Sequence, residues 1–160
     1  MSNNKIEINI PTQTLILNLG KQVYQYDISS AKNGHGQQNN SGCTPLGKHF
    51  VRAKIGSDLA PNSVLVARRP TGEIYTKELA QTFPDRDWVL TRILWLCGSE
   101  IGFNRLGDVD SMRRYIYIHG TPDTEPMGTP LSHGCIRMRN RDIIQLFDII
   151  QVGIPVTITN

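Results

Sequence analysis

The stretch 116–138, with the sequence IYIHGTPDTEPMGTPLSHGCIRM, decides both the fold and the chemistry that we expect of this chain. Side chains of a strand alternate between its two faces, so His119 leaves one face while Ile116 and Ile118 leave the other. His119 also stands directly before Gly120, where a loop rich in proline and glycine begins. The pattern predicts a strand whose last polar side chain opens onto this loop.

Cys135 follows His119 by sixteen positions and ends the motif SHGC at 132–135. A return of the loop 120–131 would place the thiol beside the imidazole. A cysteine nucleophile needs a base within hydrogen-bond reach and a third group that orients this base. An isolated cysteine is more often buried and inert, but Gly134 lets a ligand approach the backbone closely. We therefore interpret Cys135 as a nucleophile and His119 as its base.

The same motif offers two further chemical readings. The successive N–H groups of His133, Gly134 and Cys135 are candidates for an oxyanion hole, in which one donor contributes roughly 3–4 kcal/mol to transition-state stabilisation. A zinc site built from His119, His133 and Cys135 is the rival, but no Cys-x-x-Cys or His-x-x-x-His spacing accompanies them. We expect neither a metal nor another cofactor.

These residues resemble the YkuD-type L,D-transpeptidase catalytic domain. The likeness is carried by HGT at 119–121, SHGCIR at 132–137 and the turn TPLG at 44–47. It implies a mainly β fold, a YkuD-like β-sandwich with one packed α-helix near the C-terminus. It also implies that residues 1–160 form one catalytic domain.

The resemblance also implies a role for each residue of the site. His119 takes the thiol proton, and the carbonyl oxygen of Gly120 orients the imidazole. Ser132 and His133 shape the site, while Arg137 braces it or meets a substrate carboxylate. The substrates implied are peptidoglycan stem peptides or muropeptides, cleaved before a terminal D-Ala, and the implied covalent inhibitors are carbapenem-type β-lactams.

The acceptor of the acyl group stays open at this point. Water would make the protein an L,D-carboxypeptidase, whereas an amine would give a 3,3 cross-link or an anchored protein. The first residues, MSNNKIEINI, lack the basic and apolar regions of a secretory leader, and no run approaches the ~18 apolar residues of a membrane span. We therefore expect a cytoplasmic enzyme of muropeptide recycling that uses water, with a periplasmic transpeptidase as the alternative. A catalytically inactive wall-binding module is disfavoured because His119 and Cys135 are both present.

Charge points to a small acidic substrate rather than to nucleic acid or a membrane. The net charge of the 160 residues is only +3, too small to indicate nucleic-acid binding. All cations after residue 100 are arginines, whose planar guanidinium binds carboxylates through two parallel hydrogen bonds. Arg137 is the first candidate for such a contact, and Arg105, Arg113 and Arg114 are weaker because only their loop positions favour them.

The three cysteines do not form a disulfide framework. Cys97 closes an apolar run and is interpreted as a buried residue. Cys43 lies in a polar loop, and we expect it to be exposed and without a partner.

Apolar spacing predicts the main elements. The segment 88–96 is apolar at both parities, which fits a central strand or a buried helix, and its β-branched and aromatic content favours the strand. Ile143, Leu146, Phe147 and Ile150 repeat at helical spacing after Asn140, the expected N-cap. One or two helical turns are expected at 77–83. In the strand expected at 49–55, Val51, Ala53 and Ile55 should share one face. Further strands are expected at 6–10, 14–19, 22–28, 63–67 and 156–159.

Overall fold

Strand β7 (Val89–Gly98) lies at the centre of the fold because apolar residues cover both of its faces. Leu94 and Leu96 point into the main core, whereas Ile93 belongs to a second cluster on the opposite face. The prediction of a central strand rather than a buried helix is therefore confirmed. A strand covered on both sides needs apolar side chains at both parities, which explains the apolar run from Ile93 to Cys97.

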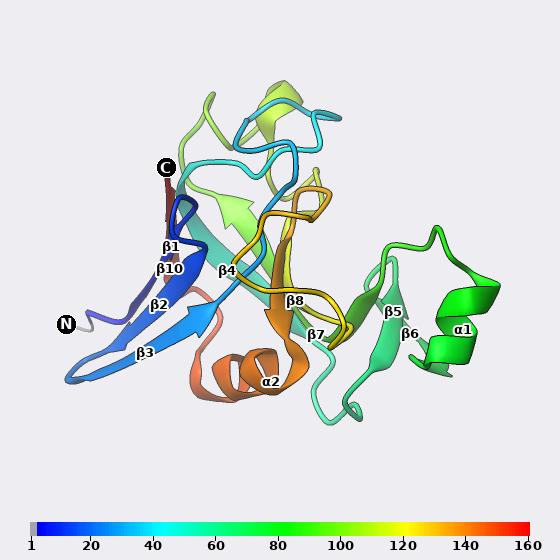
Figure 1. Ribbon diagram of the computed structural model, residues 1–160. Helices are drawn as coiled ribbons and strands as arrows, with labels where there is room; N and C mark the ends of the chain where they lie inside the picture. Colours follow the sequence, from blue (N-terminus) through cyan, green and yellow to red (C-terminus); the bar gives the residue numbers. More distant parts are fainter. Residues whose placement is uncertain (1–2) are drawn as a thin grey trace.

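The computed structural model describes residues 3–160 as a ten-stranded sheet that curls around the main core (Figure 1). The hydrogen-bonded order is β3-β2-β1-β10-β4-β7-β5-β6, and β8 and β9 extend the sheet from the other edge of β7. The pairs β1–β10 and β8–β9 are parallel, and the other pairs are antiparallel. The remaining strands are β1 (Lys5–Asn9), β2 (Thr14–Leu19), β3 (Gln22–Asp27), β4 (Gly47–Ile55), β5 (Ser63–Val66), β6 (Arg69–Ile74), β8 (Tyr117–Thr121), β9 (Ile136–Arg139) and β10 (Pro155–Thr159).

A backbone bridge closes this curl. The N–H of Ser29, just after β3, donates to the carbonyl of Arg137 in β9, and the N–H of Arg137 donates back to Ser29, both at 2.9 Å. The chain of paired strands thus returns to its starting edge and surrounds the core. The expectation of a mainly β fold with one main packed helix is confirmed.

Helix α2 (Asn140–Ile149) covers one end of the core with Ile143, Leu146 and Phe147 (Figure 1). The prediction of Asn140 as N-cap is wrong, because Asn140 is already helical and no side chain caps the helix from the preceding position. The Asn140 amide instead accepts a hydrogen bond from Thr91 Oγ1 at 2.6 Å and donates to Asn62 Oδ1 at 2.9 Å. The Asn140 amide is therefore engaged by side chains from distant parts of the chain and does not cap the N–H groups of the helix.

The other helices are short: α1 (Lys77–Thr82), as expected, and the 3-10 helix η1 (Gly107–Val109). None of the helices formed by residues 3–160 is long and apolar enough to cross a membrane.

A β-bulge in β4 divides its side chains between the two apolar clusters. The register shifts between Val51, which pairs with Leu96, and Ala53, which pairs with Trp95. Val51 therefore belongs to the main core, whereas Ile55 packs on the opposite side. The prediction that these residues share a face is wrong, because an inserted residue reverses the alternation beyond it.

The hairpin β5–β6 and helix α1 lie to one side of the curled sheet (right of Figure 1). Strand β5 joins β7 through the pairs Val64–Leu90 and Leu65–Val89. This contact creates a second apolar cluster on the outer face of β7 and β8, here called the outer cluster. Its buried members are Leu65, Ile93 and Tyr117, and the partly buried residues packed against them are Ile55, Leu59, Val89, Trp95 and Cys135.

Candidate active site

Parallel pairing of β8 with β9 brings the predicted base and nucleophile onto one face of the sheet. Ile118 pairs with Ile136, so that His119 lies opposite Arg137 and Tyr117 lies level with Cys135. The backbone N–H of Tyr117 donates to Cys135 Sγ at 3.3 Å. His119 and Cys135 therefore project to the outer face from neighbouring strands, two residues apart in register. This agrees with the expected return of the loop.

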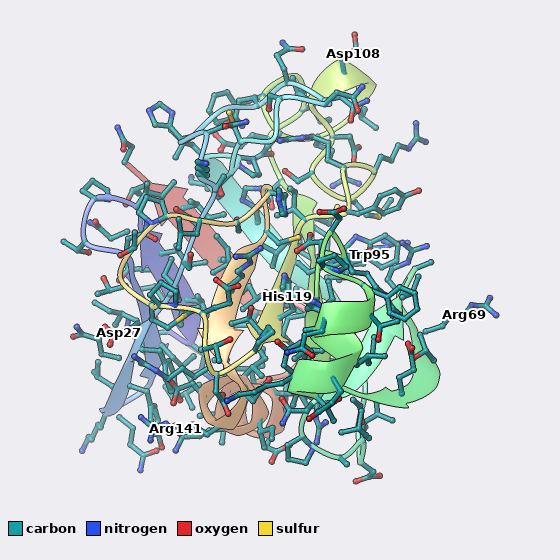
Figure 2. All side chains as sticks on the ribbon, turned by 45° about the vertical axis from the view of Figure 1, so that its right-hand side comes forward. Asp27, Arg69, Trp95, Asp108, His119 and Arg141 are labelled. Atoms are coloured by element: carbon teal, nitrogen blue, oxygen red, sulfur yellow. The ribbon has the colours of Figure 1, made fainter. Side chains whose placement is uncertain are left out.

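His119 is held as a neutral base. Its side chain is 1% exposed, near the centre of the view in Figure 2, and its Nδ1 lies 2.6 Å from the carbonyl oxygen of Gly120. Burial lowers the pKa of His119, and Arg137 lowers it further, although the Gly120 carbonyl and Asp87 act in the opposite direction. Because a carbonyl oxygen only accepts hydrogen bonds, Nδ1 carries the proton and Nε2 holds the lone pair.

Cys135 rests as a thiol. It is half-buried, and its Sγ–H donates to the carbonyl of Tyr115 at 3.3 Å. Burial raises the pKa of Cys135 to about 12, although the Tyr117 N–H counteracts part of this rise. Within residues 3–160 no hydrogen bond joins this thiol to His119, a separation that is common in enzymes before substrate binds. A resting thiol needs a base that takes its proton when it attacks.

The loop before Cys135 is fixed by side-chain hydrogen bonds. Ser132 Oγ donates to the carbonyl of Cys135 at 2.6 Å and accepts the N–H of Gly134 at 3.2 Å. Thr44 Oγ1 donates to the carbonyl of Gly134 at 2.9 Å. The Gly134 N–H is therefore occupied and does not fit the expected oxyanion hole. The N–H groups of His133 and Cys135 make no hydrogen bond in the described part of the chain and stay available.

An acidic residue that the sequence analysis missed joins the two sides of the site. Asp87, from the segment between α1 and β7, contacts Arg137 Nη2 at 3.2 Å and His133 Nδ1 at 3.3 Å. Burial raises the pKa of Asp87, but the surrounding His119, His133 and Arg137 outweigh this effect and leave the pKa below its usual value. The sequence around Asp87 does not indicate a role in the site, because Asp87 lies far from the motifs and meets them only in the folded chain.

Arg137 is 8% exposed and already paired, with Glu125 Oε2 also 3.9 Å from its Nη1. This geometry fits the bracing role that was expected of Arg137 better than the alternative contact with a substrate carboxylate.

The weaker arginine candidates differ from one another. Arg114 is committed to the loop before β4, since its guanidinium donates to the carbonyls of Gly36, Gln37 and Cys43. Arg113 is exposed and lines an open hollow of about 530 Å³. Arg105 is exposed elsewhere in the same long loop and has no role in the site geometry.

Cys43 lies in the loop that Arg114 holds, against the active-site loop. The expectation of an exposed thiol without a partner is wrong, because Cys43 is half-buried and its Sγ lies 3.6 Å and 3.7 Å from the carbonyls of Asn33 and Ser41. Cys97 is buried, as expected.

His133 stands between two hollows on the surface. One, of about 530 Å³, is lined by Tyr115 and Arg113, and the other, of about 460 Å³, by Trp88 and Arg137. An extended peptide could therefore pass His133 with residues on both sides of the thiol.

The zinc alternative lacks a ligand set here, because residues 3–160 contain no group of three His, Cys, Asp or Glu side chains placed to hold a metal ion.

Comparison with known proteins agrees with this arrangement. The family model of the L,D-transpeptidase catalytic domain, YkuD, matches residues 3–158. The putative L,D-transpeptidase YqjB of Bacillus subtilis is 43% identical over 60 residues, which is 38% of this chain and 32% of that protein. The putative L,D-transpeptidase YkuD of Bacillus licheniformis is 43% identical over 47 residues, 29% of this chain and 28% of the relative.

Solved structures share the fold. L,D-transpeptidase 3 from Mycobacterium tuberculosis superposes with a TM-score of 0.62 at 16% identity, covering 99% of this chain and 62% of that one. An Enterococcus faecium L,D-transpeptidase gives a TM-score of 0.59 at 17% identity, covering 98% and 49%. The chain thus spans about half to three fifths of these larger proteins.

Proposed function

Because the chain belongs to the L,D-transpeptidase catalytic domain family, we propose that it is a cysteine acyl-transfer enzyme acting on peptidoglycan stem tetrapeptides. The bond broken is the L,D peptide bond before the terminal D-Ala. The observation that carries this proposal is the placement of the Cys135 thiol and the His119 imidazole on one face of two paired strands. The hydrogen bond from His119 to the Gly120 carbonyl supports it, since it leaves Nε2 free to accept a proton.

The first half-reaction forms a thioester. As Cys135 Sγ attacks the carbonyl carbon, Nε2 of His119 takes the thiol proton, which the high pKa of the thiol makes necessary. The N–H groups of His133 and Cys135 stabilise the oxyanion. Collapse of the intermediate breaks the C–N bond, and the imidazolium gives its proton to the departing amine of D-Ala. During this step the Gly120 carbonyl and Asp87 stabilise the charged ring.

The second half-reaction depends on the acceptor. His119, neutral again, removes a proton from the acceptor as it attacks the thioester. The C–S bond then breaks, and the imidazolium returns its proton to the departing sulfur of Cys135. We propose water as the acceptor, which makes the protein an L,D-carboxypeptidase of muropeptide recycling in the cytoplasm. An amine acceptor is the second candidate, favoured by the hollows on both sides of His133, which offer room for two peptides.

Covalent inhibition supplies an independent consequence. A solved relative, L,D-transpeptidase 3 from Mycobacterium tuberculosis, is described with a faropenem-derived adduct, and another structure is an avibactam carbamoyl enzyme. We propose that carbapenem-type β-lactams acylate Cys135 by the same attack on a carbonyl carbon.

The deciding experiment is incubation of the purified protein with a disaccharide tetrapeptide, followed by mass spectrometry of the products. We expect tripeptide and free D-Ala, and no turnover by the Cys135→Ala variant. Cys43→Ala is the matched control, because it removes the neighbouring thiol, and we expect it to retain activity.

Each outcome has a defined meaning. Turnover by Cys135→Ala would refute the nucleophile. Cross-linked dimers as the main product would replace water by an amine as the acceptor. A carbapenem that leaves the intact mass of the wild-type protein unchanged would contradict the acylation proposal.

A further inference from the structure

Arg68, in the turn between β5 and β6, is clamped by three aromatic residues. Its guanidinium lies 4.7 Å from the ring centroids of both Trp95 and Tyr115. Its Nη1 donates to the Tyr117 hydroxyl at 2.9 Å, and the Trp95 and Tyr117 rings meet edge to face at 6.0 Å. We call Trp95, Tyr115 and Tyr117 the aromatic clamp.

The aromatic clamp surrounds the nucleophile. The carbonyl of Tyr115 and the N–H of Tyr117 each lie 3.3 Å from Cys135 Sγ. Trp95 and Cys135 pack against the same outer cluster. Two of the three residues that contact Arg68 through their side chains, Tyr115 and Tyr117, therefore also contact the reacting sulfur through their backbone.

Backbone strain marks the aromatic side of this contact. Tyr115 has φ of 57°, in a region that bulky residues rarely occupy. Such strain persists where the surrounding structure enforces it, and it is concentrated at functional sites. Arg68 has φ of 65° and Ala67 has φ of 48°, as the two-residue turn between Val66 and Arg69 requires, and this turn places Arg68 at the tip of the hairpin.

Charge pairing distinguishes Arg68 from Arg86, Arg114 and Arg137. Arg137 is paired with Asp87 and Glu125, and Arg86 with Glu73, whereas Arg114 is spent on backbone carbonyls. Arg68 has no acidic partner within 4.0 Å among residues 3–160. Among residues 3–160, Arg113 also has no acidic partner within 4.0 Å, but the cation–π contacts with the aromatic clamp are made by Arg68.

The Trp95 and Tyr115 centroids lie only 6.3 Å apart, so the two rings contact the guanidinium from adjacent directions. Only Nη1 donates to a residue within 3–160, and the other N–H donors are left for a planar anion.

We propose that Arg68 binds a free carboxylate of the donor peptide beside the scissile bond. This inference rests on the proposed function, because the donor is the stem tetrapeptide of that reaction. Two carboxylates have this chemistry: the C-terminal carboxylate of D-Ala and the one at the second centre of a diamino acid that carries it. The aromatic clamp fixes the guanidinium in advance, so the peptide meets an anion site that is already ordered.

The first test measures peptide binding by calorimetry in the Cys135→Ala background, where no turnover occurs. Arg68→Gln should weaken binding of the free-acid tetrapeptide by roughly 10- to 100-fold, as expected for a lost charge-assisted contact. Peptides amidated at one carboxylate or the other identify the partner, because Arg68→Gln should have no effect on the peptide that lacks it. Arg69→Gln is the matched control, since Arg69 is exposed and extends away from the site at the right of Figure 2. An equal loss for the free and the fully amidated peptides would overturn the proposal.

The second test needs no peptide. It compares the rates at which iodoacetate and iodoacetamide alkylate Cys135, followed by peptide mass spectrometry. The thiol displaces iodide in both cases, so the ratio of rates reports attraction of a carboxylate to the site. Arg68→Gln should lower this ratio by roughly threefold to tenfold, whereas Arg69→Gln should not.

The two tests fail in different ways. An unchanged ratio in Arg68→Gln would refute the anion site itself. If the wild-type protein does not cleave the tetrapeptide but the ratio still falls in Arg68→Gln, the proposed substrate is wrong and the carboxylate site stands. Tyr117→Phe, which removes only the hydroxyl that accepts from Arg68, should give an intermediate loss in both tests.

Discussion

The two faces of β7 and β8 are made by alternate residues of the same strands, yet they are closed in different ways. The inner face, with Leu94 and Ile118, is enclosed by a ring of hydrogen-bonded strands and by α2. The outer face, with Tyr117 and His119, is covered by side chains of residues 55–87, which include the apolar Leu65 and the acidic Asp87, whose carboxylate contacts Arg137. Backbone closure favours stability, while side-chain closure leaves room for a substrate to compete for the same groups.

Removing the base should produce the largest effect, and it should be confined to the outer face. His119→Ala should lower kcat by ~10²–10⁴-fold, the usual contribution of general acid–base catalysis. The free energy of unfolding, measured with denaturant, should change far less. His133→Ala is the control and should reduce kcat less, because its ring is exposed and meets Asp87 rather than the thiol. A larger loss in His133→Ala would mean that the two histidines have been exchanged in the mechanism.

The reciprocal change on the inner face should separate stability from catalysis. Ile118 neighbours His119 but is fully buried in the main core. Ile118→Ala should cost about 2–5 kcal/mol in the free energy of unfolding, through lost burial and the cavity left behind. The kcat of the molecules that remain folded should stay within a few-fold of the wild type. A loss of kcat as large as in His119→Ala would show that the two faces are not independent.

Lowering the pH should reduce the free energy of unfolding through buried histidines, whereas the apolar core should not respond to pH. His49 is buried, with Nε2 2.8 Å from Ser111 Oγ, and burial lowers its pKa to about 4. The unfolded chain binds this proton near pH 6.5, so the stability that His49 contributes is present above that pH and is lost as the pH falls toward 4. The loss should reach about 2–3 kcal/mol, and the lowered pKa of His119 acts in the same direction.

Denaturant unfolding between pH 7 and pH 4.5 measures this loss. His49→Gln should flatten the dependence, whereas Ile118→Ala should lower stability equally at both pH values. A His49→Gln variant with the wild-type slope would contradict the assignment of this loss to His49.

Local alternation was enough to predict the parts of the site that lie on one strand or in one motif. The parity of His119, the central strand 88–96 and the SHGC loop follow from side-chain periodicity and from glycine positions. Asp87 and Arg68 could not be found this way, because Asp87 meets Arg137, and Arg68 meets Tyr117, only in the folded chain. Arg68 lies before residue 100, far in sequence from Cys135, and only the folded chain brings it to Tyr117.

Two of the wrong predictions, on Asn140 and on the faces of β4, have a common cause. The Asn140 side chain does not cap the helix because it is hydrogen-bonded to Thr91 and Asn62. The bulge in β4 appears in its pairing with β7. Neither partner is visible within a short window of sequence. Asp87 was missed for the same reason, since its neighbours His119, His133 and Arg137 come from elsewhere in the chain.

The bridge at Ser29 bears on the order in which the molecule folds. Ser29 Oγ accepts the N–H of Leu131, 102 positions away, and donates to the carbonyl of Thr129. Contacts of such long sequence separation form late, because a large loop must close before they are gained. The loop that presents the nucleophile is therefore fixed only after the two ends of the curled sheet have met. We expect acyl transfer, which needs the thiol and the imidazole on one face, to appear only at the last step of folding, whereas the thiol of a partly folded chain is still exposed to other reagents.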